Sequence, residues 1–243
     1  MILQIFGKKT VYRTNHDSIR KAVLFLHGWG GNKNSFDSVF FTLPYRTVAL
    51  DLWGFGESDP PDEAGWSTAD YADAVAEFLR RLDLTGVDVV AHSFGARVAI
   101  QLAVRHPQAV NKLLLTGAAG LKPAFSLKKK LRVLQYKTAK RLQRVFPVST
   151  DRFGSRDYLA LTPQLRQTFL LAVNEDLSLL AKKIGCETLL YWGKEDAETP
   201  LSMGKRLHRL IADSTLICVS GGHFAYLNRS FGSVVRNFFG GVV

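Results

Sequence analysis

Hydrophobic positions fall into two patterns that alternate along most of the chain. Short runs rich in valine, isoleucine and leucine predict strands, and from the third run onward these runs are nearly continuous in apolar residues. Continuous runs are typical of a parallel sheet with helices on both faces. The predicted strands are residues 2–6, 10–13, 22–27, 47–51, 87–92, 112–116, 188–192 and 216–220.

Helical periodicity occupies the stretches between these runs. Residues 68–82 repeat apolar side chains along one face, and Ser67 or Thr68 can cap the start of this helix. Alternation of strands and helices predicts a doubly wound α/β sheet, and the first two strands are expected to add a short antiparallel edge. Further helices are predicted at residues 93–105, 201–211 and 230–239.

Residues 120–185 interrupt the alternation. Apolar side chains recur every three or four positions from 127 to 145, which predicts an amphipathic helix that ends at Pro147. A second helix is predicted at 162–180 before the strands resume. The sequence therefore predicts a core in two parts, residues 1–119 and 186–243, with a helical insertion at 120–185.

Charge is concentrated in the same insertion. The chain of 243 residues is 47% hydrophobic, which is ample for a sizeable core, and its net charge is +11. Residues 121–185 hold 14 lysines and arginines against 4 acidic residues, so the rest of the chain is almost neutral. Aromatic residues are not interleaved with these cations as a base-stacking platform, so no nucleic-acid partner is expected.

Other compositional features narrow the class of protein. The two cysteines have no spacing that predicts a disulfide framework or a metal site, and we expect neither a metal nor another cofactor. The N-terminal apolar run is too short for a signal peptide, and no run approaches the length of a membrane span. We therefore expect a soluble cytoplasmic protein, and nothing in the sequence indicates its oligomeric state.

The stretch VVAHSFGAR places a serine where a strand runs directly into a helix. Ser93 must then lie on the turn itself, and the small residues Ala91 and Gly95 allow the strand and the helix to approach closely. The turn falls at the carboxyl end of a parallel strand, where ligands bind in open α/β sheets. The Ser93 hydroxyl would lie at the N-terminus of the following helix, where the helix dipole stabilises negative charge that develops in a reaction.

These residues carry a resemblance to a known family. AHSFG resembles the nucleophile elbow of the α/β-hydrolase family, usually G-x-S-x-G, with Ala91 in place of the first glycine. LFLHGWGG resembles the loop of that family that supplies part of the oxyanion hole, which implies that the backbone N–H groups of Trp29 and Phe94 hold the oxyanion. DLWGFGESD resembles the loop after the fourth strand, in which Asp51 is expected to have a structural role.

A serine nucleophile needs a base, and the base needs an acid. His223 lies just beyond the last strand in VSGGHFAYL and matches the catalytic histidine of the family, whereas His92 is expected to point away from the serine. LLYWGKEDAETP resembles the family pattern around the acid and implies Asp196, with Glu195 and Glu198 as close competitors. The chain order of serine, aspartate and histidine is the order expected of this fold.

The resemblance implies an eight-stranded, mostly parallel α/β-hydrolase fold, with residues 120–185 forming a helical cap after the sixth strand. Its implied activity is that of a carboxylesterase that cleaves small or medium acyl esters through an acyl-enzyme on Ser93. Thioesterase, lipase, aminopeptidase and carbon–carbon hydrolase activities remain open, as does a ligand-binding protein without turnover. The basic insertion would serve as a solvated face, attract anionic substrates, or dock on an anionic membrane.

Overall fold

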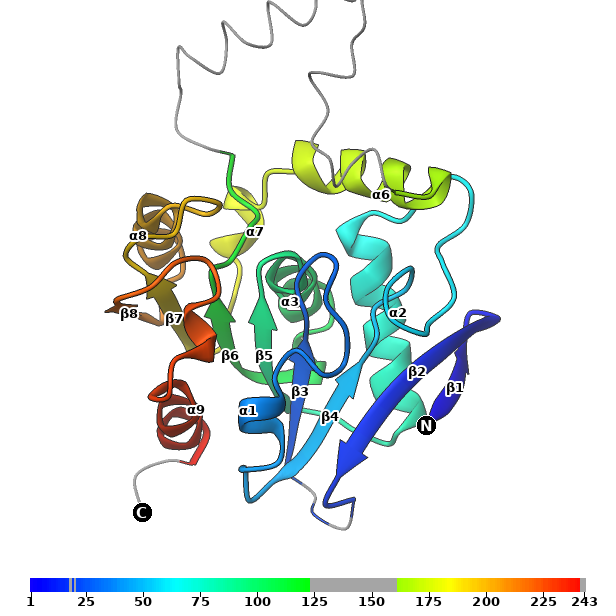
Figure 1. Ribbon diagram of the computed structural model, residues 1–243, viewed down its shortest axis with the longest axis horizontal. Helices are drawn as coiled ribbons and strands as arrows, with labels where there is room; N and C mark the ends of the chain where they lie inside the picture. The colour runs from blue at the N-terminus through cyan, green and yellow to red at the C-terminus, as the bar shows by residue number, and fades with distance from the viewer. Residues whose placement is uncertain (18, 20, 123–160, 241–243) are drawn as a thin grey trace, which may run out of the picture.

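The computed structural model describes residues 1–17, 19, 21–122 and 161–240, and an eight-stranded sheet forms its centre (Figure 1). The strands are β1 (Ile2–Ile5), β2 (Lys8–Asn15), β3 (Ala22–Leu26), β4 (Arg46–Leu50), β5 (Val87–His92), β6 (Val110–Thr116), β7 (Thr188–Gly193) and β8 (Ser214–Val219). Their order across the sheet is β1-β2-β4-β3-β5-β6-β7-β8. β2 pairs antiparallel with both β1 and β4, and every pair from β4 to β8 is parallel. The predicted parallel sheet with an antiparallel edge is thus confirmed.

Helices cover both faces of this sheet, as the sequence predicts. The helices are α1 (Asp37–Phe40), α2 (Thr68–Arg81), α3 (Phe94–Arg105), α6 (Pro163–Asn174), α7 (Ser178–Ala181), α8 (Leu201–Leu210) and α9 (Phe231–Gly240). Side chains of α1 and α9 share one apolar core, and those of α2, α3, α7 and α8 share the other. Because successive strand residues point to opposite faces, β5 sends Val89 into one core and Val90 into the other. Its continuous apolar run follows from this double burial.

Helix α2 begins where the sequence predicts. Ser67 is the N-cap, its hydroxyl accepts from the backbone N–H of Asp70, and the Asp70 carboxylate accepts in return from the backbone N–H of Ser67. The apolar face of α2 is buried. In its first turn, the Tyr71 hydroxyl donates to the Trp53 carbonyl oxygen at 2.6 Å. The helix is thereby fixed against the loop that follows β4.

The prediction of one helix over residues 162–180 is wrong, because the structure has two helices, α6 and α7. The backbone of Glu175 is extended at the break between them. Its carboxylate accepts from Thr68 Oγ1 of α2 at 2.5 Å and from Gln101 Nε2 of α3 at 2.9 Å. The Asp176 carboxylate then accepts from the Ser178 backbone N–H at 3.0 Å, just before α7 begins. Figure 1 shows α6 lying beyond the carboxyl ends of the central strands.

Part of the predicted insertion cannot be compared with the structure. The amphipathic helix expected at 127–145 lies outside the described residues, so the division into 1–119, 120–185 and 186–243 stays a prediction. In the described part of the chain, no helix combines the length and the apolar character needed to cross a membrane.

Candidate active site

Ser93 occupies the turn between β5 and α3. Its φ of 49° and ψ of −107° lie outside the regions that L-residues favour, as in the strained strand-to-helix turn of a nucleophile elbow. A Cβ atom on Gly95 would lie 2.5 Å from the Leu26 carbonyl oxygen, so glycine is what lets α3 pack this closely on β3. The Ser93 hydroxyl makes no capping hydrogen bond to α3 and is free to face another partner.

That partner is His223, in the loop after β8. Its Nε2 lies 3.0 Å from Ser93 Oγ, and its Nδ1 lies 2.9 Å from Oδ2 of Asp196, in the loop after β7. With a proton on Nδ1 facing the carboxylate, Nε2 presents its lone pair to the serine hydroxyl. The structure thus brings together the three side chains that the sequence singles out, each from the carboxyl end of a different parallel strand.

Asp196 is buried and held by its own loop. Its Oδ1 accepts from the backbone N–H groups of Glu198 at 2.9 Å and Thr199 at 2.8 Å. The Thr199 hydroxyl lies 2.8 Å from Asp196 Oδ2 and 3.0 Å from the Gly117 carbonyl oxygen. Gly117 has a φ of +49°, and a Cβ there would lie 3.2 Å from His223 Nδ1. Sequence reasoning missed both supporting residues, although Thr199 stands in the same motif as the aspartate.

The other two carboxylates of this loop have different partners. Glu195 accepts from the backbone N–H of Gly221 at 2.5 Å and so braces the histidine loop. Glu198 lies on the far side of the imidazole, with Oε2 3.4 Å from His223 Nε2 and a side chain that is 66% exposed. Of the three carboxylates that the sequence left open, Asp196 is the one that faces His223 Nδ1.

The loop after β3 packs its aromatic residue against the turn that carries Ser93. The Trp29 ring makes edge-to-face contacts with Phe55, Phe94 and Phe169, at centroid distances of 4.9, 5.1 and 5.3 Å. Phe169 belongs to α6, so this helix also contacts the loop. Within the described residues, the backbone N–H groups of Trp29 and Phe94 donate to no protein acceptor. Both amides that the resemblance assigns to an oxyanion hole therefore remain available to a ligand.

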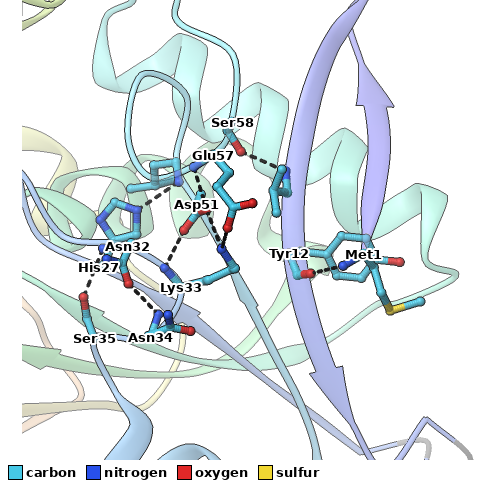
Figure 2. Close-up of polar contacts among 12 residues, drawn as sticks. Met1, Tyr12, His27, Asn32, Lys33, Asn34, Ser35, Asp51, Glu57 and Ser58 are labelled. Carbon is cyan, nitrogen blue, oxygen red and sulfur yellow. Dashed lines mark hydrogen bonds and ion pairs between the residues drawn. The ribbon is translucent and has the colours of Figure 1, made fainter.

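Asp51 has a structural role, as the sequence predicts (Figure 2). It is fully buried and accepts from the Lys33 backbone N–H at 2.6 Å, from Lys33 Nζ at 3.0 Å and from the Glu57 backbone N–H at 2.9 Å. His27 makes a second connection between these loops, because its Nε2 accepts from the Leu52 backbone N–H at 2.9 Å. These contacts tie the loops after β3 and β4 together beside Ser93.

Two buried histidines flank the site without a hydrogen bond to Ser93. Burial lowers the pKa of His27 to about 4, and its Nδ1 lies 2.8 Å from the Gly28 carbonyl oxygen. Burial, and then the proximity of His223, lower the pKa of His92 to about 3. Although the sequence predicts only that His92 points away from Ser93, its ring lines the same pocket and lies against His223 with 4.6 Å between centroids. Its Nδ1 is held at 3.0 Å from the Thr116 carbonyl oxygen.

A pocket of about 220 Å³ opens over Ser93 and His223. Its other described walls are the glycine-rich loop around Trp29, Ser35, the rings of His92, Phe224 and Tyr226, and the carboxylate of Glu198. Among the described residues, no group of three or more histidine, cysteine or acidic side chains is arranged to hold a metal ion. Ser93, His223 and Glu198 bring a hydroxyl, an imidazole and a carboxylate to the pocket, and a serine beside an imidazole suits attack on a carbonyl.

Comparisons with known proteins place the chain in a family. Residues 21–148 match the family described as the alpha/beta hydrolase fold. A pimeloyl-[acyl-carrier protein] methyl ester esterase of Neisseria meningitidis serogroup A is 32% identical over 254 residues, covering 93% of this chain and 79% of that protein. An uncharacterized protein of Mycobacterium tuberculosis is 40% identical over 102 residues, but the match spans only 30% of its length. The chain belongs to the α/β hydrolase fold family.

Solved structures agree with this assignment at the level of the fold. An esterase from Exiguobacterium antarcticum has a TM-score of 0.78 and 24% identity, covering 98% of both chains. A meta-cleavage product hydrolase from Pseudomonas fluorescens has a TM-score of 0.76 and 24% identity, covering 99% of this chain and 97% of its own. The predicted α/β-hydrolase fold is confirmed, and the chain is a member of a family of hydrolases.

Proposed function

We propose that the protein is a serine hydrolase that cleaves carboxylic esters of small or medium acyl groups. The observation that carries the proposal is the chain of hydrogen bonds from Ser93 Oγ through His223 to Asp196, at 3.0 and 2.9 Å. An unassisted serine hydroxyl is not ionised at neutral pH, and this arrangement supplies both the base and the group that orients it. The ester named in the Neisseria relative supports an ester substrate.

Acyl transfer would proceed in two steps. As Ser93 Oγ bonds to the ester carbonyl carbon, His223 Nε2 takes the hydroxyl proton, and the negative charge on the carbonyl oxygen is met by the amides of Trp29 and Phe94. When the bond from the carbonyl carbon to the alcohol oxygen breaks, the same proton passes to the departing alcohol. Water then attacks the acyl-enzyme with His223 again as base, which releases the carboxylic acid and restores the serine.

A protein that keeps the fold for ligand binding alone is the alternative of a different class. Such a protein would have no need of a serine in a strained backbone conformation with its hydroxyl held by a buried histidine and aspartate. Thioester, amide and carbon–carbon bond cleavage use the same chemistry. Substrates of those kinds therefore belong in a test of the proposal.

Replacement of the nucleophile tests the proposal. Hydrolysis of p-nitrophenyl esters of graded chain length is measured for the parent protein, for Ser93→Ala and for the control Ser233→Ala, which removes a hydroxyl on α9 instead. We expect Ser93→Ala to lower kcat by about 10⁴-fold or more, because the residual rate comes from the oxyanion site and binding alone. If the parent does not exceed Ser93→Ala on any ester, the proposed esterase function fails, and turnover of only a thioester, amide or carbon–carbon substrate would assign Ser93 to that reaction instead.

A further inference from the structure

Two carboxylates flank the same imidazole, one at each nitrogen. Asp196 meets His223 Nδ1 at 2.9 Å and is buried, whereas Glu198 lies 3.4 Å from Nε2 and is 66% exposed at the pocket wall. The triad leaves no task for the second carboxylate. Its backbone N–H is fixed by the bond to Asp196 Oδ1, so the loop holds the residue at this position whatever its side chain does.

The position of Glu198 relative to the reacting atoms follows from the proton path. His223 Nε2 must deliver a proton to the departing alcohol oxygen, which therefore comes within about 3 Å of Nε2 in the reaction. Since Glu198 Oε2 is 3.4 Å from the same nitrogen, it lies no more than about 6 Å from that oxygen. Glu198 is therefore close to the alcohol part of a bound ester.

The walls of the pocket near this carboxylate suit a cation. Among the described residues that line it, Glu198 is the one acidic residue, and none is a lysine or an arginine. Phe224 lines the same pocket, is 54% exposed, and has its ring edge-to-face with His223 at 5.4 Å. Aromatic rings bind ammonium groups through their faces and carboxylates bind them through charge, and residues of both kinds line this pocket.

We propose that Glu198 is a specificity-determining residue that favours esters whose alcohol part carries a positive charge, such as esters of amino alcohols. The inference rests on the proposed esterase function and adds to it the charge of the leaving group. For an ammonium group held about 6 Å from the carboxylate, the attraction changes kcat/KM by about threefold in water-like surroundings and by about a hundredfold at an effective dielectric constant near 20. Because Glu198 is largely exposed, we expect a preference of three- to tenfold.

Two esters that differ in charge but hardly in shape provide the test. Acetylcholine ends in a trimethylammonium group, and 3,3-dimethylbutyl acetate ends in the neutral tert-butyl group of the same outline. The ratio of their kcat/KM values, divided by the ratio of their rates with hydroxide, is measured for the parent, for Glu198→Gln and for Glu187→Gln. The last variant removes the same charge beside the start of β7, at the opposite edge of the sheet.

We expect a corrected ratio of three or more for the parent and for Glu187→Gln, and a ratio near one for Glu198→Gln. The parent's ratio should also fall when salt is raised to about 0.5 M, because exposed charges are screened. A parent ratio near or below one overturns the inference. So does a Glu198→Gln variant that slows both esters equally, since Glu198 would then act only through His223. Failure to hydrolyse any p-nitrophenyl ester would instead contradict the proposed function.

Discussion

At the scale of single residues, Asp196 differs from its acidic neighbours in the atoms that it contacts. Its Oδ2 faces His223 Nδ1 and its Oδ1 is held by two backbone amides, so Asp196→Asn would keep the loop in shape while removing the acceptor that sets the histidine tautomer. We expect kcat for ester hydrolysis to fall by about 10⁴-fold with little change in thermal stability. The measurement is kcat for a p-nitrophenyl ester, with a melting curve for each variant.

Glu195→Gln is the matched control for this substitution. The glutamine oxygen can still accept from the Gly221 backbone N–H, so kcat should stay within a few-fold of the parent value. A near-normal rate for Asp196→Asn would instead transfer the acid role to Glu195 or Glu198.

His27 and His92 couple the stability of the fold to pH. Burial keeps both imidazoles neutral, with pKa values of about 4 and about 3, whereas in the unfolded chain histidine titrates near pH 6.5. Below pH 6.5 the unfolded state therefore binds more protons, and the free energy of unfolding falls as the pH falls toward the lowered pKa values. Between pH 8 and pH 5 each histidine should cost about 2 kcal/mol of stability.

Urea unfolding at pH 8 and pH 5 checks this expectation. Carboxylates contribute to the same pH dependence, so the informative quantity is the difference between variant and parent. His92→Phe should lose about 2 kcal/mol less than the parent between the two pH values, and His16→Gln, which removes an exposed imidazole, should follow the parent. Equal pH dependence in His92→Phe and the parent would show that His92 does not resist protonation in the fold.

At the scale of elements, the close approach of α3 to β3 depends on one missing methyl group. A Cβ on Gly95 would meet the carbonyl oxygens of Leu26 at 2.5 Å and His27 at 2.6 Å, and this end of β3 cannot move without disturbing the loop that carries Trp29. We expect Gly95→Ala to destabilise the protein by about 2 kcal/mol or more and to lower kcat as well. Gly185→Ala is the control, because a Cβ there meets nothing within 4 Å. A Gly95→Ala variant as stable and active as the parent would show that the turn at Ser93 tolerates a larger separation between α3 and β3.

Elements with a strong local signal were predictable, and those determined by long-range contacts were not. The run of apolar residues in β5 identified a strand buried on both faces, and Ser67 with Asp70 marked the start of α2. By contrast, the break between α6 and α7 depends on Glu175 reaching Gln101, which is 74 positions away in the sequence. The sequence predicted that Ser93, Asp196 and His223 meet, because each follows the carboxyl end of a parallel strand. Nothing in the sequence predicted that Glu198 would lie near Nε2 of His223.

At the scale of the whole molecule, the charge is distributed unevenly between the core and residues 121–185. That segment carries nearly all of the net charge of +11, and three of its lysines are consecutive at 128–130. Clustered cations raise the local concentration of anionic ligands over distances up to the Debye length of about 8 Å at physiological ionic strength. This long-range attraction would oppose the local preference of Glu198 for cations, so the two effects must be separated by experiment.

Charge reversal at Lys128, Lys129 and Lys130 to glutamate separates them. If the segment steers anions, KM for a p-nitrophenyl ester with a terminal carboxylate on its acyl chain should rise severalfold, while KM for the neutral ester of the same length should change little. The rise should disappear near 0.5 M salt. The corrected ratio for acetylcholine and 3,3-dimethylbutyl acetate shows whether the Glu198 effect persists in the reversed variant. Equal changes in KM for anionic and neutral esters would contradict steering and leave the basic segment as a solvated face.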